Sequence, residues 1–179
     1  MSVLLEALVF ASKKHRHQRR KDREASPYIN HPIMLANILW NEAEIRDLTA
    51  VAASILHDTV EDTETTLQEI ELAFGPRVAS VVAEVTDDKT LPKQARKQLQ
   101  VLHAASASDQ AKLVKIADKI ANLRDLATSP PPSWSSERVS AYFEWSKAVI
   151  DALRGNHPRL EALFDEAYAN GTREQSETR

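Results

Sequence analysis

The segment from Leu56 to Asp62 places several ionisable side chains at the polar end of an apolar helical pattern. It contains His57 and the carboxylates Asp58, Glu61 and Asp62. Three negative charges within five residues repel one another, so they favour a bound cation or a cationic partner. The alternative is a solvated acidic helix end with an incidental histidine, because an isolated His-Asp pair is a weak signal.

Two other segments carry side chains of the same chemical types. His31 precedes a proline, and the alternative interpretation there is a helix-capping or core histidine. Asp118 interrupts an otherwise apolar helical run, and Asn122 follows it one turn later. Because burying a bare carboxylate is costly, Asp118 needs a specific partner. The alternative is an ordinary surface face that it shares with Lys119 and Arg124.

Together these segments supply two imidazoles and two carboxylates, from His31, His57, Asp58 and Asp118. Nitrogen and oxygen donors of this kind suit a divalent ion such as Mn, Fe or Zn, with open positions for water. The chain contains no cysteine, which excludes a disulfide framework, a thiolate metal site and a cysteine nucleophile. Any metal site must therefore be built from histidine and carboxylate side chains.

The elements that must hold these side chains are predicted to be helices. Only 3 glycines occur in 179 residues, whereas average usage of ~7% would give about a dozen. Sheet-rich folds and phosphate-binding loops need glycine for tight turns and close backbone approach, so this shortage favours helices. The glycine-rich Rossmann and P-loop motifs are both absent from the sequence.

Helical periodicity, capping residues and prolines divide the chain into successive elements. The strongest apolar stripe consists of Leu48, Val51, Ala52, Ile55 and Leu56. The helix that begins at Pro32 is expected to bury Ile33, Ala36 and Leu39. Further helices are predicted over residues 3–17, 67–74, 78–85, 92–105, 109–127, 135–154 and 158–169. We therefore predict one all-α domain of about eight helices over residues 1–170, followed by a disordered polar tail at 171–179.

The overall composition is that of a soluble globular protein, with 42% hydrophobic and 27% charged residues. Lys and Arg number 23 against 26 Asp and Glu, and this net charge of −3 argues against a protein that holds nucleic acid by charge. The N-terminal segment lacks the features of a signal peptide, and no apolar run approaches the ~18 residues of a membrane span. We therefore expect a cytoplasmic protein with neither a membrane nor a stable nucleic-acid partner.

The chemistry-bearing segments, taken in order, resemble the HD hydrolases of the RelA/SpoT family. They are most similar to the stand-alone small alarmone hydrolases, the group that includes the metazoan SpoT homologue. A bare His-Asp pair is weak evidence, but the whole segment from His57 to Asp62 with its flanking blocks is specific. The resemblance extends roughly from Leu4 to Leu153. The matching segments are residues 17–21, 27–32, 56–62, 86–89, 114–126 and 142–145.

The resemblance implies an HD-type helical domain that uses Mn²⁺, with Zn or Fe as alternatives. The implied reaction removes the 3′-pyrophosphate of guanosine tetra- and pentaphosphate and releases GDP or GTP with pyrophosphate. The implied metal ligands are His31, His57, Asp58 and Asp118. Glu61 and Asp62 would be the catalytic pair that orients or deprotonates the attacking water, and the sequence does not specify which of them is the base.

An anionic substrate requires cations near these acids, and seven of the 23 Lys and Arg residues lie within residues 13–23. The resemblance places Arg20 and Lys21 against the phosphates and the base, with Lys93 as a further phosphate contact. It places Asn122 at the ribose hydroxyl and Tyr142 at the nucleotide. The alternatives are a solvated helix end or a nucleic-acid patch for the basic run, and a plain core aromatic for Tyr142.

Two other functions stay open from the sequence. The same metal chemistry could act on adenosine alarmones or on the 2′-phosphate of NADPH, because base selectivity depends on a few loop atoms. A non-catalytic module could instead hold RNA or another polyanion through residues 13–23, although the intact ligand set and the net charge of −3 argue against it. The chain is too short for an added synthetase domain, and the sequence does not specify the oligomeric state.

Overall fold

The computed structural model describes residues 2–155 and 157–177, and this part of the chain contains helices and no β-strand. The elements are α1 (Ser2–Lys14), α2 (Asn30–Asn37), the π-helical η1 (Ile38–Glu42), α3 (Leu48–Leu56), α4 (Thr59–Asp62), α5 (Leu67–Phe74), α6 (Pro76–Val85), α7 (Lys93–Leu102), α8 (Asp109–Thr128), α9 (Ser136–Asp151) and α10 (Pro158–Glu177). The predicted all-α fold class is confirmed, and the described residues form more helices than the approximately eight expected. Among the described helices, none combines the length and apolar character that crossing a membrane requires.

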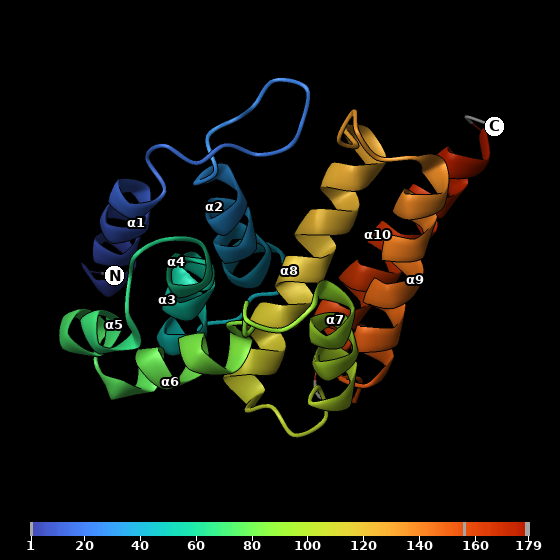
Figure 1. Cartoon of the computed structure of the whole chain (residues 1–179). Helices are drawn as coiled ribbons and strands as arrows, with labels where there is room; N and C mark the ends of the chain where they lie inside the picture. Colours follow the sequence, from blue (N-terminus) through green and yellow to red (C-terminus); the bar gives the residue numbers. More distant parts are fainter. Residues whose placement is uncertain (1, 156, 178–179) are drawn as a thin grey trace.

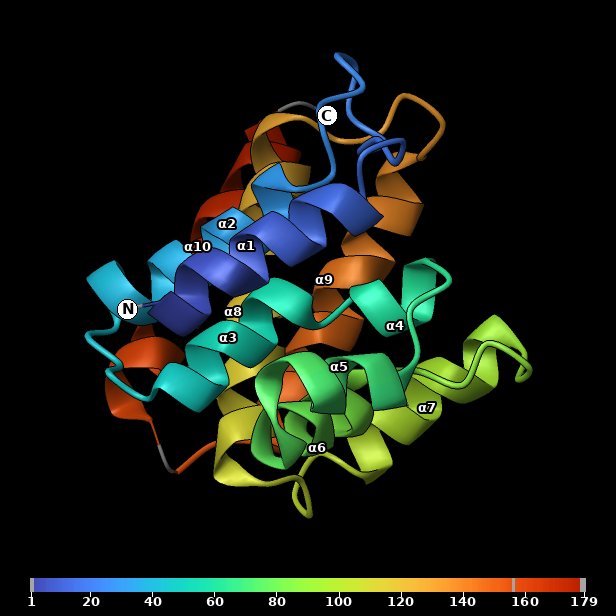
Figure 2. The same ribbon diagram turned by 90° about the vertical axis from the view of Figure 1, so that its left-hand side faces the viewer.

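The central element is α8, which runs between two groups of helices (Figure 1). It contacts α2, α3 and α6 in one group, and α9 and α10 in the other. In the first group, α1 packs along α3 (Figure 2). A side chain near the middle of α8 can therefore meet side chains from α2 and α3.

The apolar core forms two clusters, and α8 contributes to both. The first lies between α2, η1, α8, α9 and α10 and includes Phe143 and Phe164. The second is built around α3, in which every residue from Ala50 to Leu56 is buried. The predicted stripe of α3 is confirmed except at its first residue, because Leu48 is 40% exposed.

The helix α2 turns a different face to the core than its apolar residues indicate. Ile33 and Met34 are 46% and 43% exposed, whereas His31, Pro32 and Leu35 are buried. The prediction that Ile33 faces the core is therefore wrong. His31 and Leu35 stand one turn apart on the buried face, so burial of the imidazole fixes the rotation of the helix.

Two helix boundaries near the candidate site also differ from the expected ones. The helix α1 ends at Lys14 rather than near His17, because the chain turns at His15 and the N–H of Gln18 bonds to the His15 carbonyl at 2.9 Å. The apolar helix α3 ends before His57, and the short helix α4 then carries the two acids predicted to be catalytic. Because the helices are interrupted here, the polar side chains that follow Lys14 and Leu56 point in directions that a continuous helix would not allow.

Of residues 171–179, predicted to be a disordered tail, those through Glu177 are helical, and residues 178–179 lie outside the described part of the chain. Within α10, Gly171 is buried, and a Cβ at this position would overlap the Phe143 ring and lie 3.5 Å from the Cβ of Ala127. The prediction that the fold ends near residue 170 is therefore wrong. The glycine permits close contact between α10, α8 and α9, which a local reading of polar residues does not reveal.

Gly171→Ala should destabilise the protein by about 1–3 kcal/mol, because over-packing forces buried neighbours to move. Phe143 is only 1% exposed and has little room to shift, while the higher helix propensity of alanine returns at most ~1 kcal/mol. Urea unfolding measures the change. The exposed neighbour Asn170→Ala should stay within about 0.5 kcal/mol of wild type. An unchanged unfolding free energy for Gly171→Ala would contradict the close packing.

Candidate metal centre and active site

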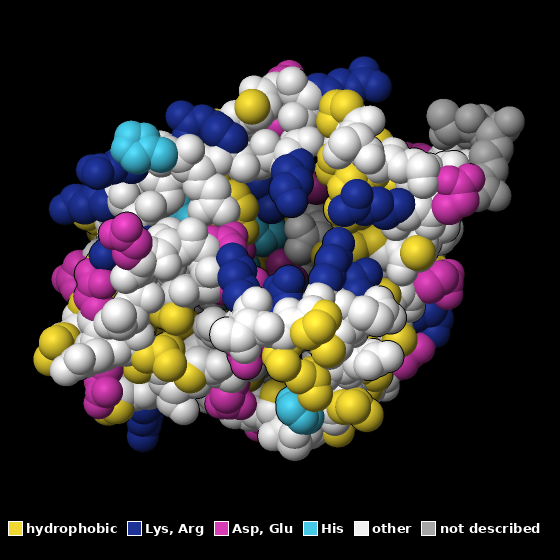
Figure 3. Space-filling view, viewed as in Figure 1, with side chains coloured by type: hydrophobic (Ala, Val, Ile, Leu, Met, Phe, Trp, Pro, Cys, Tyr) yellow, Lys and Arg dark blue, Asp and Glu magenta, His cyan; other side chains and the backbone are white. Residues whose placement is uncertain are grey.

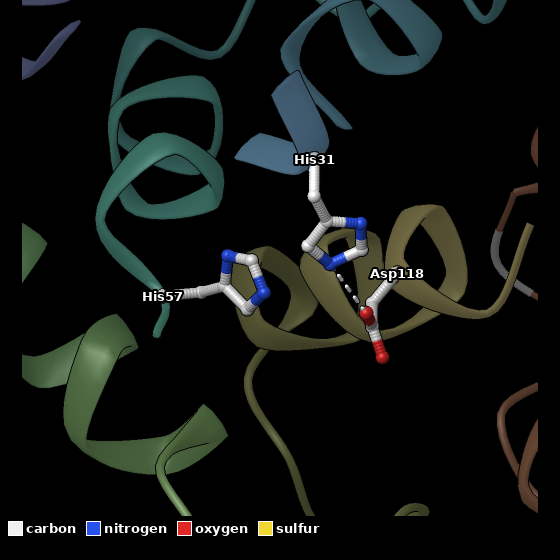
Figure 4. Close-up of side chains that lie close together, drawn as sticks. All are labelled: His31, His57 and Asp118. Carbon is white, nitrogen blue, oxygen red and sulfur yellow. Dashed lines mark hydrogen bonds and ion pairs between the residues drawn. The ribbon is translucent and has the colours of Figure 1, made fainter. Parts of the chain in front are cut away.

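Three helical segments bring two imidazoles and a carboxylate to one place (Figure 4). His31 belongs to the first turn of α2, His57 follows the last residue of α3, and Asp118 lies near the middle of α8. One ligand atom of each residue lies within 4.8 Å of those of the other two. The packing of α2 and α3 against α8 therefore creates this cluster from residues far apart in the sequence.

The orientations of the two imidazoles direct nitrogen atoms into the cluster. The Nδ1–H of His57 donates to the carbonyl of Ser54 at 2.9 Å, which turns Nε2 toward the other side chains. Within the described structure this buried Nε2 has no hydrogen-bond partner. The Nε2 of His31 lies 3.2 Å from Oδ1 of Asp118. A buried imidazole nitrogen without a hydrogen bond fits a metal ligand, because coordination would supply the missing partner.

Asp58 stands beside this cluster. Its Oδ2 lies 2.9 Å from Nε2 of His57, outside the geometry of a directed hydrogen bond, and accepts a hydrogen bond from the Tyr28 hydroxyl. The structure thus brings three of the four predicted ligands into one cluster and places the fourth next to His57. The role of Asp58 as a ligand stays a prediction.

Asp118 is surrounded by hydrogen-bond donors. Its Oδ1 accepts a 2.6 Å hydrogen bond from Asn122, and its Oδ2 forms a 2.9 Å ion pair with Lys119. Lys119 is only 4% exposed, and its Nζ lies 4.5 Å from the ring centroid of Trp145 on α9. This buried lysine is a specific partner of the kind that a carboxylate in an apolar run requires.

Burial and ion pairing act against each other at these groups. Burial disfavours charge on Asp118, but Lys119 and His31 outweigh it and hold the pKa of the carboxyl well below its usual range. Burial also disfavours the His57 cation, whereas the adjacent Asp58 carboxylate raises the pKa of His57 to about 9. At His31 burial dominates and lowers the pKa. Without a metal, the cluster therefore holds an ionised Asp118, a neutral His31 and a protonated His57, and a divalent ion would displace the His57 proton as it binds.

The two acids of α4 have different surroundings. Glu61 accepts a hydrogen bond from the N–H of Asp87 at 3.1 Å. Burial raises the pKa of Glu61 to about 7, against the opposing effect of that N–H and with the added repulsion of nearby carboxylates. Asp62 is held instead by two donors, Gln18 at 2.8 Å and Lys89. Glu61 is thus the acid whose proton is poised near neutral pH.

A cavity of about 440 Å³ opens next to these groups. Its lining includes Arg20, Lys21, Tyr28, Asp62, Asn122 and Tyr142. Tyr28 and Asn122 hydrogen-bond to predicted metal ligands, so the cavity adjoins the metal cluster. Figure 3 shows dark-blue Lys and Arg side chains around a hollow in which magenta acids and a cyan histidine are visible. The site therefore combines a cationic rim with acids and imidazoles at greater depth.

Two of the three predicted phosphate-binding cations line the cavity. Arg20 and Lys21 line the cavity, and the Arg20 guanidinium is held by Asp125 at 2.5 Å and by Asn122 at 3.2 Å. Lys93, at the start of α7, is not among the described lining residues. Burial, followed by neighbouring cations that include Lys21, lowers the pKa of Lys93, so this lysine belongs to the same cationic region.

Tyr142 lies in an aromatic group at the cavity wall. Its ring centroid is 5.8 Å from that of Trp134, which also lines the cavity, and 5.2 Å from that of Trp145. Burial raises the pKa of Tyr142 to about 12, so its hydroxyl stays protonated at neutral pH. The rings are inclined to one another by 55° and 66°, so a purine could stack on the face of one ring at a time.

Several side chains around the site have no functional role in the sequence interpretation. They are Gln18, Tyr28, Lys89, Arg96 and Lys119. Four of them contact a predicted ligand or Asp62, and Arg96 lies 3.6 Å from Glu61. All except Arg96 belong to the segments that carry the family resemblance, so those segments could have identified them as site residues. Arg96 reads as an ordinary surface cation because its contact depends on where α7 packs.

Comparisons with known proteins agree on one family. The sequence pattern of the HD domain matches residues 7–142 of this chain. The Homo sapiens guanosine-3′,5′-bis(diphosphate) 3′-pyrophosphohydrolase MESH1 is 58% identical over 158 residues, which cover 88% of this chain and 88% of that protein. The Drosophila melanogaster protein of the same name is 49% identical over 164 residues, or 92% of each chain.

A solved structure, described as a metazoan ortholog of SpoT that hydrolyzes ppGpp and plays a role in starvation responses, has the same fold. Its TM-score is 0.91 at 48% sequence identity, and the alignment covers 94% of this chain and 95% of that one. The GTP pyrophosphokinase rsh of Brucella melitensis is 37% identical over 131 residues, which are 70% of this chain but 17% of that protein. The similarity there is confined to one part of a much longer chain.

Proposed function

We propose that this chain, which belongs to the HD-domain family that includes MESH1, is a Mn²⁺-dependent hydrolase of guanosine 3′-pyrophosphates. Its substrates would be guanosine tetra- and pentaphosphate, and its products GDP or GTP with pyrophosphate. Zn and Fe also suit a set of imidazole and carboxylate donors. We place this activity in the cytoplasm, with a small nucleotide as the partner.

The convergence of His31, His57 and Asp118 beside a cavity with a cationic rim carries this proposal. A bound divalent ion would supply positive charge that polarises a phosphoryl oxygen and makes the attacking water more acidic. The buried Nε2 of His57 and the ionised Asp118 fit such an ion. Asp58 would complete the ligand set from its position next to His57.

Glu61 would accept the proton of the attacking water, because a pKa of about 7 suits proton transfer near neutral pH. Asp62, held by Gln18 and Lys89, would orient that water. The water oxygen adds to the phosphorus next to the ribose 3′ oxygen, and the bond between this phosphorus and the 3′ oxygen breaks. The 3′ oxygen takes up a proton and becomes a hydroxyl, and pyrophosphate leaves.

The cationic rim would neutralise the charge of the phosphates. Arg20 would exchange its ion pair with Asp125 for contacts with phosphate oxygens, because a planar guanidinium can bind two such oxygens at once. The remaining proposed contacts are Lys21 and Lys93 to the phosphates, Asn122 to the ribose and Tyr142 to the purine.

A nucleotide panel tests the proposal. With Mn²⁺, the purified chain should convert guanosine tetraphosphate to GDP and pyrophosphate in equal amounts, as measured by ³¹P NMR. GTP, which has no 3′-pyrophosphate, should stay intact. Adenosine alarmones and NADPH at the same concentration test the two alternative substrates. Turnover of an adenine nucleotide without turnover of guanosine tetraphosphate would show that the same chemistry acts on another substrate. No turnover of any of these nucleotides would contradict the proposal that the chain is a hydrolase.

A further inference from the structure

A chain of side-chain hydrogen bonds runs from the end of α1 to the acid pair. The Nδ1–H of His15 donates to Oε1 of Gln18 at 2.6 Å, and Nε2 of Gln18 donates to Oδ2 of Asp62 at 2.8 Å. His15 is only 2% exposed, although it lies in a loop between two helices. Burying a polar ring is costly unless its nitrogen atoms form hydrogen bonds, so the hydrogen bond to Gln18 helps to explain the burial of His15.

We propose that His15 and Gln18 are positioning residues that hold the Asp62 carboxylate in its working orientation, a role that rests on the proposed hydrolysis. A glutamine amide can rotate by about 180°, which exchanges its acceptor and donor ends. In the rotated form, the amide oxygen of Gln18 would face a carboxylate oxygen of Asp62, and two acceptors repel. The His15 donor prevents this rotation because it requires the amide oxygen on its own side.

Neither hydrogen-bond donor of Asp62 is buried, but only Gln18 is fixed at its far end by a buried side chain, His15. Lys89 forms an ion pair with the second oxygen of Asp62, but the lysine side chain is 49% exposed. An exposed ion pair is screened by solvent and costs side-chain entropy, so it restrains a carboxylate poorly. We therefore expect the anchored amide of Gln18, rather than the long Lys89 side chain, to set the orientation of Asp62.

The His15 ring also packs against Tyr28, the hydrogen-bond partner of Asp58, which immediately precedes α4. Its ring centroid lies 4.8 Å from that of Tyr28, and the Tyr28 hydroxyl donates to Asp58. One buried imidazole thus contacts the partners of both Asp58 and Asp62. Two different substitutions are needed to separate its ring packing from its hydrogen bond.

The backbone near Gln18 is held independently of its side chain. The N–H of Gln18 bonds to the His15 carbonyl at 2.9 Å, and the N–H of Tyr28 bonds to the Gln18 carbonyl at 3.2 Å. A backbone bridge between Arg19 and Pro27 closes the same loop. A substitution of the Gln18 side chain should therefore preserve the loop and alter mainly the contact with Asp62.

The experiment compares steady-state kinetics of matched variants. Gln18→Met removes both hydrogen bonds at nearly constant volume, and it should lower kcat about ten-fold or more, with KM and bound metal near wild type. His15→Phe keeps a ring against Tyr28 without the donor and should lower kcat in the same way. His15→Asn places an amide donor near the position of Nδ1 and should restore most of kcat. Gln68→Met, at an exposed position of α5, is the control and should match wild type.

The outcomes separate this role from the function on which it rests. A wild-type chain that hydrolyses no 3′-pyrophosphate would overturn the proposed function, whatever the variants do. An active wild type with unchanged kcat in Gln18→Met would overturn the positioning role alone. So would a His15→Asn variant no better than His15→Phe, because asparagine packs worse than phenylalanine and can exceed it only through its donor. Circular dichroism identifies a variant that does not fold, and the two His15 variants then decide between the outcomes.

Discussion

Replacing His57 by alanine should remove the bound divalent ion and the hydrolysis together. We expect kcat/KM to fall by roughly 10³-fold or more, because the charge that the ion supplies at the phosphate is lost. His57 offers a buried Nε2 within 4.8 Å of the ligand atoms of His31 and Asp118, and an alanine removes one of the three donors of this cluster. Metal analysis of the purified variant should show only background.

Thermal unfolding provides a measurement that does not depend on activity. A ligand at 100 times its dissociation constant stabilises the folded state that binds it by about 2.7 kcal/mol. For a domain of this size, that free energy corresponds to a rise in Tm of roughly 5–10 °C. Mn²⁺ should therefore raise the Tm of the wild-type protein and leave the Tm of His57→Ala unchanged.

The matched control is His103→Ala, because His103 is exposed at the end of α7. This variant should keep both the metal-dependent rise in Tm and the activity. If His57→Ala also kept both, the metal would be bound elsewhere, and the cluster on α2, α3 and α8 would not be the metal centre.

The metal cluster is the part of the site that the sequence could predict. His57 ends and Asp118 interrupts an apolar helical pattern, and His31 stands beside the proline that begins a helix; all three are local features of the sequence. Burial of each apolar face leaves few directions for the polar side chain. The different setting of Asp58 could not be predicted, because it depends on the Tyr28 hydroxyl, which belongs to a loop 30 residues away.

The roles of Lys119 and Gly171 could not be predicted from local sequence patterns. Adjacent residues on a helix point in different directions, so the sequence indicates an exposed lysine next to Asp118. In the structure, Lys119 is buried between Asp118 and Trp145 of α9. Gly171 likewise lies where α10 touches Phe143 of α9. Both features arise from the packing of α9 and α10 against α8, which no short segment of sequence contains.

Glu61→Gln should abolish turnover while the metal stays bound. An amide cannot accept the proton of the attacking water, so we expect kcat to fall by about 10²–10⁴-fold. Glu61 does not belong to the described three-residue cluster of ligand atoms, so metal content and the Mn²⁺-dependent rise in Tm should match wild type. Loss of metal in this variant would place Glu61 in the ligand set instead.

The same substitution should make the metal-free protein relatively more stable at higher pH. Burial raises the pKa of Glu61 from 4.5 to about 7, so the folded chain binds this proton more tightly than the unfolded chain. The resulting stabilisation is complete below pH 4.5 and is lost as the pH rises through about 7. Glutamine has no such loss, so the unfolding free energy of the variant relative to wild type should increase between about pH 5 and about pH 8.

Urea unfolding of metal-free protein at those two pH values measures this difference. Glu71→Gln, at an exposed position of α5, removes the same charge from a solvated site and should show no comparable change with pH. If Glu61→Gln behaved like Glu71→Gln, the carboxyl of Glu61 would be as well solvated as a surface acid. Its proposed role as the base near neutral pH would then lose its physical basis, because burial is the main cause that raises its pKa to the range in which it can both take up and release a proton.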